Sequence, residues 1–280
     1  MSNKHKNRVA FQGELGAFSH FAAIKLAGPR TALLPCESFK QVFESLRRGD
    51  AAKAVIPIEN TLHGSVHENY DYLLQFDMPI AGETTLRISH NLVVLPDVKL
   101  AQIRRAFSHP VALNQCRRFF DEHPRIEPVA FYDTAGSVKM LKEQRPAGAA
   151  AIASEMAAQL YGARIIERNI EDNPHNFTRF FLLTKQNAVP KHVNEGWKTS
   201  IVFSTANTPG ALFRAMACFA LRDLNLTKIE SRPLPERPWE YLFYLDFFGS
   251  QTDEKVQRAL DHLREMATFF KVLGSYRPTP

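Results

Sequence analysis

The sequence predicts an α/β protein in two parts, with parallel sheets covered by helices in the first part and a smaller βαββαβ unit after it. The chain has 280 residues, a length that suggests about two domains. Short apolar runs alternate with helical patterns up to about residue 185, and a polar stretch then separates a second, shorter pattern. With 45% hydrophobic and 23% charged residues, the composition is that of an ordinary globular protein.

The first part repeats one pattern, in which an apolar run is followed by small polar residues and then by a helix. Strands that alternate with helices in this way are typical of parallel sheets. Ser19, Ser108, Asp133 and Ser154 each stand where a helix N-cap is expected, and Pro110 suits a first turn. The expected strands are residues 9–11, 54–58, 103–107, 129–132 and 149–153, and the helix after 103–107 is expected to run through Phe120.

The repeated pattern also predicts a ligand site. In open α/β sheets, ligands bind beyond the carboxyl ends of the strands, where helix N-termini present free N–H groups. The polar clusters all fall at such ends and together predict a cleft for an anionic, oxygen-rich small molecule. The alternative for any one of them is a helix cap without further function.

The second part follows a polar stretch at 186–197, which we interpret as a linker. Strands are expected at 199–203, 226–230, 241–248 and 270–273, with helices beginning at Pro209-Gly210-Ala211 and covering 256–267. The order is βαββαβ, a split βαβ unit. Small sheets of this kind have open edges and commonly pair with a second copy.

Composition narrows the class of protein. Lys and Arg exceed Asp and Glu by 35 − 29 = 6 charges, but the basic residues are scattered, which favours a mixed-charge surface over a nucleic-acid interface. There is no run of roughly 18 apolar residues and no secretory signal pattern, so a cytoplasmic location is expected. Three widely spaced cysteines predict neither disulfides nor a structural zinc site, so no metal is expected.

Several blocks of the chain resemble the signature motifs of prephenate dehydratases. They run in family order from about residue 8 to about residue 275. Ala17 and Asp133 depart from the family pattern, since Thr and Ser are frequent at those two positions. The blocks are Gly16-Ala17-Phe18-Ser19, Pro57-Ile58-Glu59-Asn60 with Gly64-Ser65-Val66, Ser108-His109-Pro110 with Gln115-Cys116, and Asn176-Phe177-Thr178-Arg179-Phe180. Pro209-Gly210-Ala211-Leu212 and Glu230-Ser231-Arg232-Pro233 are similar to the ligand-sensing motifs of the ACT domain.

The resemblance implies a two-lobed, periplasmic-binding-protein-like (type II) catalytic domain at 7–185 and a ferredoxin-like ACT regulatory domain at 198–277. The implied reaction is the decarboxylating dehydration of prephenate to phenylpyruvate in L-phenylalanine biosynthesis, without a cofactor. No chorismate mutase pattern precedes residue 8, so the monofunctional form is expected. A homodimer or homotetramer is implied as well.

The resemblance also assigns site residues. Thr178 is implied as a hydrogen-bond donor to the leaving hydroxyl, with Asn60 and Gln115 as amide donors beside it. If 177–180 is a regular strand, Arg179 points away from Thr178 and Phe180, and a structural ion pair is then the alternative to carboxylate binding by Arg179. Glu59 and His109 are titratable candidates for proton transfer. An ionised Glu59 would repel a dianionic substrate, and for His109 a packing or capping role is the alternative. Residues implied in substrate binding are Ser19, Ser65, Thr134, Asn176, Arg179 and Phe180.

In the second part, the resemblance implies a phenylalanine site. Gly210, Ala211 and Leu212 would receive the charged end of the amino acid, and Glu230, Ser231, Arg232 and Pro233 would face it from a neighbouring subunit. Feedback inhibition by phenylalanine follows, and a dimerisation module without sensing is the alternative. For the whole chain, the rival functions are arogenate dehydration and ligand binding without catalysis.

Overall fold

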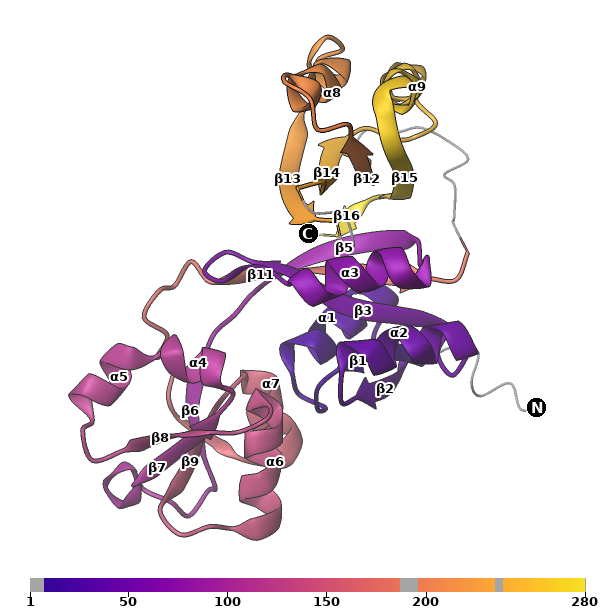
Figure 1. Ribbon diagram of the computed structural model, residues 1–280. Coiled ribbons are helices and arrows are strands. Elements are labelled where there is room, and N and C mark those ends of the chain that lie inside the picture. Colours follow the sequence, from indigo (N-terminus) through magenta and orange to yellow (C-terminus); the bar gives the residue numbers. More distant parts are fainter. Residues whose placement is uncertain (1–7, 187–195, 235–238, 280) are drawn as a thin grey trace. The chain divides into compact units, whose positions relative to one another are not determined.

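The computed structural model describes residues 8–186, 196–234 and 239–279 (Figure 1). The chain forms two compact units. Unit 1 comprises residues 1–72 and 84–180, and unit 2 comprises residues 73–83 and 181–280. The predicted linker at 186–197 lies largely outside the described residues.

Unit 1 consists of two lobes, each with its own sheet (Figure 1). The first lobe takes residues 8–72, 84–87 and 177–180, and its central strand β1 pairs in parallel with β2 and β3. Its sheet order is β2-β1-β3-β11-β5. The elements are β1 (Arg8–Gln12), α1 (Phe18–Ala27), β2 (Ala32–Cys36), α2 (Phe39–Arg48), β3 (Lys53–Asn60), β4 (Gly64–Ser65), α3 (His67–Phe76), β5 (Ile80–Arg87) and β11 (Phe177–Thr184).

The second lobe takes residues 91–167, with sheet order β10-β6-β9-β7-β8. Strand β7 is parallel to β8 and β9, whereas β6 is antiparallel to β9 and β10. Its elements are β6 (Asn91–Val94), η2 (Leu100–Gln102), β7 (Arg105–Ser108), α4 (Pro110–Asn114), α5 (Arg117–Glu122), β8 (Glu127–Ala130), α6 (Thr134–Gln144), β9 (Ala149–Ala153), α7 (Glu155–Tyr161) and β10 (Arg164–Glu167). The β9 sequence Ala-Ala-Ala-Ile-Ala is buried throughout, as expected for a strand covered on both faces.

Two crossover segments, 88–90 and 168–176, connect the lobes and are bonded to each other. The backbone N–H of Ile88 donates to the carbonyl of Asn176 at 2.8 Å, and that of Ile170 donates to the carbonyl of His90 at 2.8 Å. Buried Glu171 accepts from Arg87 Nη2 at 2.8 Å and from the backbone N–H of His90 at 2.9 Å. The paired crossover therefore holds the two lobes on either side of one opening.

Unit 2 contains the predicted βαββαβ order. Its elements are β12 (Lys198–Thr205), α8 (Ala211–Ala220), β13 (Leu226–Pro233), β14 (Tyr241–Phe248), α9 (Glu254–Met266), β15 (Ala267–Tyr276) and β16 (Pro278–Thr279). The antiparallel sheet has the order β13-β14-β12-β15, and α8 and α9 both lie on the same side of it (Figure 1). Phe203, Phe219 and Phe247 belong to the core between sheet and helices.

The structure confirms the α/β fold class with its second, antiparallel part, and it corrects several local expectations. Ser19 is the second residue of α1 and Ala17 is the N-cap, while Ser108 donates from Oγ to the carbonyl of Ile152 at 2.6 Å and His109 caps α4. The helix expected to run through Phe120 is two short helices that break at Cys116. Asp133 and Ser154 cap α6 and α7 as predicted, accepting from the N–H groups of Gly136 and Ala157.

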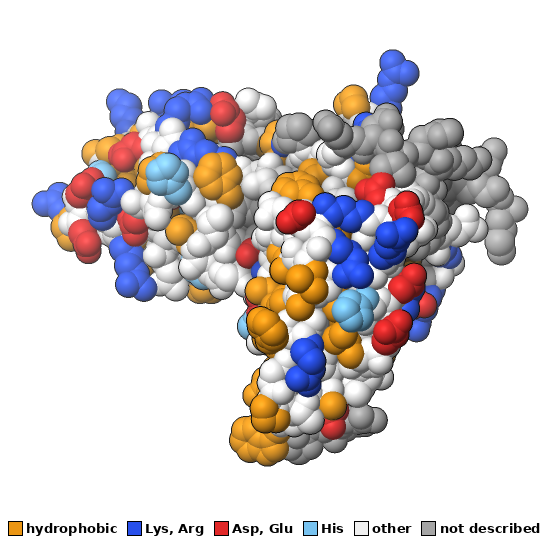
Figure 2. Space-filling model, turned by 90° about the horizontal axis from the view of Figure 1, so that it is seen from above, with side chains coloured by type: hydrophobic (Ala, Val, Ile, Leu, Met, Phe, Trp, Pro, Cys, Tyr) orange, Lys and Arg blue, Asp and Glu red, His pale blue; other side chains and the backbone are white. Residues whose placement is uncertain are grey.

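The surface carries both signs of charge. On the face drawn in Figure 2, basic and acidic side chains are interspersed and the basic ones form no continuous stripe. In the described parts of the chain, no helix is long and apolar enough to cross a membrane.

Candidate active site

A cavity of about 590 Å³ lies between the two lobes of unit 1. The carboxyl ends of β1 and β3, the first residues of β11 and the start of α1 line it from the first lobe, and the starts of α4 and α6 line it from the second. This is the edge of the sheets at which the sequence predicts a ligand. The lining includes seven of the predicted site residues, namely Ser19, Asn60, Ser65, Gln115, Thr134, Thr178 and Phe180.

The alternation of strand β11 decides which of its side chains reach the cavity. Thr178 and Phe180 line it and are 8% and 2% exposed. Arg179 points to the other face of the strand, where its Nε lies 3.6 Å from Glu59 Oε2, and it is absent from the lining. The structure therefore places Arg179 in an ion pair with Glu59, outside the lining of the cavity.

The amide of Asn60 has a fixed orientation. Its Oδ1 accepts from the backbone N–H groups of Leu62 and His63 at 2.9 and 3.0 Å, and backbone nitrogens can only donate. Its Nδ2 consequently faces Asn176 Oδ1 at 2.8 Å and Thr178 Oγ1 at 2.9 Å. The hydroxyl oxygen of Thr178 therefore accepts from Asn60, which leaves the Thr178 hydroxyl hydrogen to donate to a group in the cavity.

The direction of these hydrogen bonds also determines how the amide of Gln115 is oriented. Because Asn176 accepts with Oδ1, its Nδ2 donates to Gln115 Oε1 at 3.0 Å. The Nε2 of Gln115 then donates to His63 Nδ1 at 3.0 Å, and Gln115 Oε1 accepts from His90 Nε2 at 2.8 Å. Asn176 is fully buried behind the cavity and orients the two amides that line it. Every member of this chain thus has a determined donor or acceptor role, set by two backbone N–H groups.

His63 and His90 line the cavity, and the motifs did not single them out. His63 stands three residues after Asn60, so its position next to a recognised motif could have marked it as a candidate site residue. His90 lies in the crossover, and no sequence pattern marks it. Burial lowers the pKa of His90, which favours the neutral ring that donates to Gln115.

Two helix N-termini at the cavity differ in whether a side chain caps them. Helix α1 has no side-chain cap, and Ser19 lies in its first turn, so its N–H groups suit a carboxylate. Helix α6 is capped by the carboxylate of Asp133, whose Oδ1 accepts from the N–H of Gly136 at 2.7 Å. Burial raises the pKa of Asp133. His109, another lining residue, accepts with Nδ1 from the N–H of Val111 at 3.2 Å, and burial lowers its pKa.

The residues of the predicted phenylalanine site lie in unit 2. Gly210 is the N-cap of α8 with φ +75°, a conformation that favours glycine, and Ala211 and Leu212 begin the helix. Strands β12 and β13 both run antiparallel to β14 and are therefore parallel to each other. As a result, the end of β13, which carries Glu230, Ser231, Arg232 and Pro233, lies at the same edge of the sheet as the turn at Gly210.

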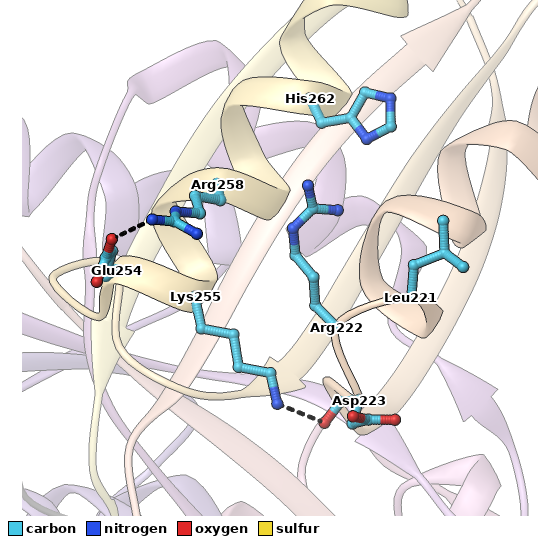
Figure 3. A pocket seen from close by; sticks show the side chains of 7 residues that line it. All are labelled: Leu221, Arg222, Asp223, Glu254, Lys255, Arg258 and His262. Atoms are coloured by element: carbon cyan, nitrogen blue, oxygen red, sulfur yellow. Dashed lines mark hydrogen bonds and ion pairs between the residues drawn. The ribbon is translucent and has the colours of Figure 1, made fainter.

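A second cavity of about 590 Å³ lies in unit 2 beside α9 (Figure 3). Its basic side chains already have partners within the unit. Arg258 pairs with Glu254, Lys255 Nζ lies 3.5 Å from the carbonyl oxygen of Asp223, and Arg222 Nη1 donates to the carbonyl of Cys218 at 2.9 Å. None of the predicted site residues lines it. The cavity of unit 1 is therefore the candidate active site. Within the described residues, no three His, Cys, Asp or Glu side chains are grouped as ligands for a metal ion.

A two-lobed α/β domain with amide and hydroxyl groups in its cavity, followed by a βαββαβ domain, is the architecture that comparison with known proteins assigns to a family. The family model for prephenate dehydratase matches residues 9–188, and the chain belongs to this family of hydro-lyases. The curated protein "Arogenate dehydratase/prephenate dehydratase 2, chloroplastic" of Arabidopsis thaliana is 46% identical over 285 residues, covering 99% of this chain and 74% of that protein.

Two solved structures share the fold over nearly the whole chain. The prephenate dehydratase of Arthrobacter aurescens in complex with L-Phe is 33% identical with a TM-score of 0.87, over 96% of this chain and 90% of that one. GqqA, described as a novel type of quorum quenching acylase, is 34% identical with a TM-score of 0.89, over 98% of each chain.

Proposed function

We propose that the chain catalyses the decarboxylating dehydration of prephenate to phenylpyruvate in L-phenylalanine biosynthesis, with arogenate, which yields phenylalanine, as the second candidate substrate. Family membership supports the reaction class, and the names of the curated relatives support both substrates for those relatives. The observation that carries the proposal is the Thr178 hydroxyl. Asn60 donates to its oxygen at 2.9 Å, so its hydrogen is directed to an acceptor in the cavity.

The reaction needs a donor at one oxygen. The carboxylate carbon leaves the ring as carbon dioxide, and the electron pair of the broken C–C bond forms the aromatic ring. The C–O bond on the opposite side breaks, and the departing hydroxide takes one proton to become water. We assign to Thr178 the hydrogen bond that strengthens as negative charge develops on this oxygen.

The remaining groups bind and orient the substrate. Ser19 with the uncapped N-terminus of α1, and Ser65 and Thr134 in the same lining, are proposed to bind carboxylate oxygens through hydroxyl and N–H donors. Phe180 offers an apolar wall to the ring. Gln115 is held by Asn176 and donates from Nε2 at the opposite wall. Arg179, which the sequence motifs favoured for carboxylate binding, is proposed instead to hold strand β11 through Glu59.

Phenylalanine is the proposed effector, bound at Gly210–Leu212 and Glu230–Pro233. The relative that was solved with L-Phe has the same fold over 96% of this chain. The proposed domains are 7–185 for catalysis and 198–277 for regulation, and the proposed assembly is a homodimer or homotetramer.

The test is incubation of the purified chain with prephenate and, separately, with arogenate. Phenylpyruvate is read from its absorbance and phenylalanine by chromatography, together with the carbon dioxide released. Turnover of at least one substrate is expected. A folded preparation that turns over neither would refute the enzyme proposal and would leave ligand binding without catalysis.

A further inference from the structure

The charges that line the active-site cavity are unexpected for a site that takes a dicarboxylate. Three carboxylates belong to the lining, those of Glu37, Glu68 and Asp133, and no lysine or arginine does among the described residues. Glu37 and Glu68 are exposed to solvent, where their charges are screened. Asp133 is 8% exposed, so a hydrogen bond that a ligand makes to its carboxyl group is little screened by solvent.

Asp133 is held in one position. Its Oδ1 accepts from the N–H of Gly136 at 2.7 Å, as the N-cap of α6. On the other side lies Gly13, with φ +105°, where an added Cβ would come within 2.8 Å of Asp133 Oδ2. Any side chain at residue 13 would therefore collide with Oδ2, so glycine at this position allows the carboxyl group of Asp133 to keep its place.

The groups around Asp133 do not neutralise it. Glu14 and Lys139 form a pair, with Nζ at 3.1 and 3.2 Å from the two carboxylate oxygens, and Tyr132 Oη donates to the same Glu14 at 3.0 Å. The pair adds no net charge. Burial lowers the pKa of His109, which favours its neutral form. Burial raises the pKa of Asp133, and the backbone N–H of Gly136 that it caps opposes this shift. Asp133 is consequently the buried carboxyl group of the described cavity lining, at a helix start that would otherwise present free N–H groups.

The two candidate substrates differ at one group of the side chain, where prephenate has a keto oxygen and arogenate has an ammonium. A keto oxygen can only accept a hydrogen bond, whereas the ammonium donates three, and a carboxylate can only accept. Arogenate also carries one negative charge in total, and prephenate carries two. We propose that Asp133 is a specificity-determining residue, which accepts a hydrogen bond from the substrate ammonium and makes arogenate the preferred substrate of this chain. This inference rests on the proposed dehydratase function.

The experiment compares the two substrates in the wild type, Asp133→Asn and Asp133→Ser. Asn and Ser both cap helices well, so each variant keeps α6 capped while it removes the charge. The readout is the ratio of kcat/KM for arogenate to kcat/KM for prephenate, from which differences in folded fraction cancel. A hydrogen bond to a charged group predicts that this ratio exceeds 1 in the wild type and falls about 10- to 100-fold in both variants. Glu37→Gln is the matched control, because it removes a carboxylate from the exposed rim, and the ratio should change far less.

The outcomes separate the inference from the function on which it rests. Turnover with an unchanged ratio in Asp133→Asn and Asp133→Ser overturns the role of Asp133 and leaves the dehydratase proposal intact. A wild type that prefers prephenate also overturns the inference. No turnover of either substrate by the folded wild type overturns both proposals.

Discussion

At the scale of single residues, the site depends on the direction of its hydrogen bonds. Two backbone N–H groups orient the amide of Asn60, and each following donor and acceptor is then determined as far as His63 and His90. A hydroxyl alone could rotate to donate or accept. The fixed amide of Asn60 is the reason why we propose Thr178 as a hydrogen-bond donor to the ligand.

Replacement of Thr178 tests that role. Thr178→Ala should lower kcat by roughly 10²- to 10³-fold with little change in KM, because the lost hydrogen bond belongs to the transition state. Thr178→Ser keeps the hydroxyl and should retain most of the activity. Steady-state kinetics with both substrates gives the comparison. Wild-type turnover by Thr178→Ala would remove this residue from the mechanism.

Replacement of the Asn60 amide by a carboxylate tests the direction of its hydrogen bond to Thr178. In Asn60→Asp the donor that faces Thr178 Oγ1 and Asn176 Oδ1 becomes an acceptor, so the Thr178 hydroxyl turns toward the new carboxylate and away from the substrate. We expect kcat to fall about as far as in Thr178→Ala, roughly 10²-fold or more. The double variant Asn60→Asp/Thr178→Ala should then be little slower than either single variant, because the two residues act as one unit. If the fall in kcat of the double variant equals the product of the two single falls, Asn60 does not act by orienting the Thr178 hydroxyl.

The sequence alone identified the site residues that lie within motifs, but it did not identify those that lie in the crossover segments between the lobes. Asn60, Gln115 and Thr178 occur in recognisable blocks, and the structure places all three at one cavity. Strict alternation in a strand also predicted that Arg179 would point away from Thr178. His90 reaches Gln115 only because the segments 88–90 and 168–176 pair with each other, and such a long-range contact leaves no local pattern.

At the scale of elements, the start of α1 packs directly on α7. Gly16 has φ +96°, and an added Cβ would lie 2.8 Å from Ala157 Cα. Ser154 Oγ donates to the carbonyl of Gly16 at 2.7 Å, and the N–H of Gly16 donates to His20 Nδ1 at 2.8 Å. This close approach joins the two lobes at one side of the cavity.

Gly16→Ala should therefore cost more stability than the backbone conformation alone explains. We expect a loss of about 2–4 kcal/mol, from left-handed strain together with the clash against the α7 backbone. Gly28→Ala is the control, since Gly28 has a similar φ of +94° and nothing within 4 Å of its added Cβ. It should cost about 1–2 kcal/mol. Urea unfolding followed by circular dichroism measures the free energy of unfolding of both variants. Equal losses would show that the contact with Ala157 adds nothing to the cost of the Gly16→Ala substitution.

Helix starts were predicted well where an acceptor side chain precedes the helix directly, as at Asp133 and Ser154. They were wrong at Ser19, two positions after the Ala17 cap, and at Ser108, one position before the His109 cap, because a small polar residue near a cap has the same appearance in the sequence. Strands β5 and β6 were not anticipated. The short crossover between them carries no clear turn signal, and no alternation of apolar and polar residues continues through it to mark where one strand ends and the next begins.

At the scale of the whole molecule, the positive excess does not reside in the active site. The chain carries a net +6, yet the described lining of the cavity holds carboxylates and neutral donors. On the face drawn in Figure 2, basic and acidic side chains are interspersed, and such charges attract small anions over a distance of about 10 Å at most in physiological salt.

Regulation by phenylalanine, as proposed above, would involve the complete chain. Phenylalanine should lower the activity of the wild type, and Gly210→Val or Arg232→Ala should weaken that inhibition at least several-fold. The valine is strained at φ +75°, and the alanine removes a charged group at the end of β13. Inhibition curves with calorimetric titration of phenylalanine provide the measurement. Unchanged inhibition and binding in both variants would place the sensing site elsewhere.

Strand β11 begins beside the cavity at Phe177 and continues without interruption to Thr184 in unit 2. Because its side chains alternate, insertion or deletion of a single residue within it would exchange Thr178 for Arg179 on the cavity face and would bury a guanidinium where the ring wall of Phe180 belongs. Natural variation in this strand is therefore expected to proceed by substitution only. Changes in the length of the chain are expected in its surface loops, such as the connection between α6 and β9, which lies outside the lining of the cavity and where an added residue leaves the Thr178 hydroxyl in place.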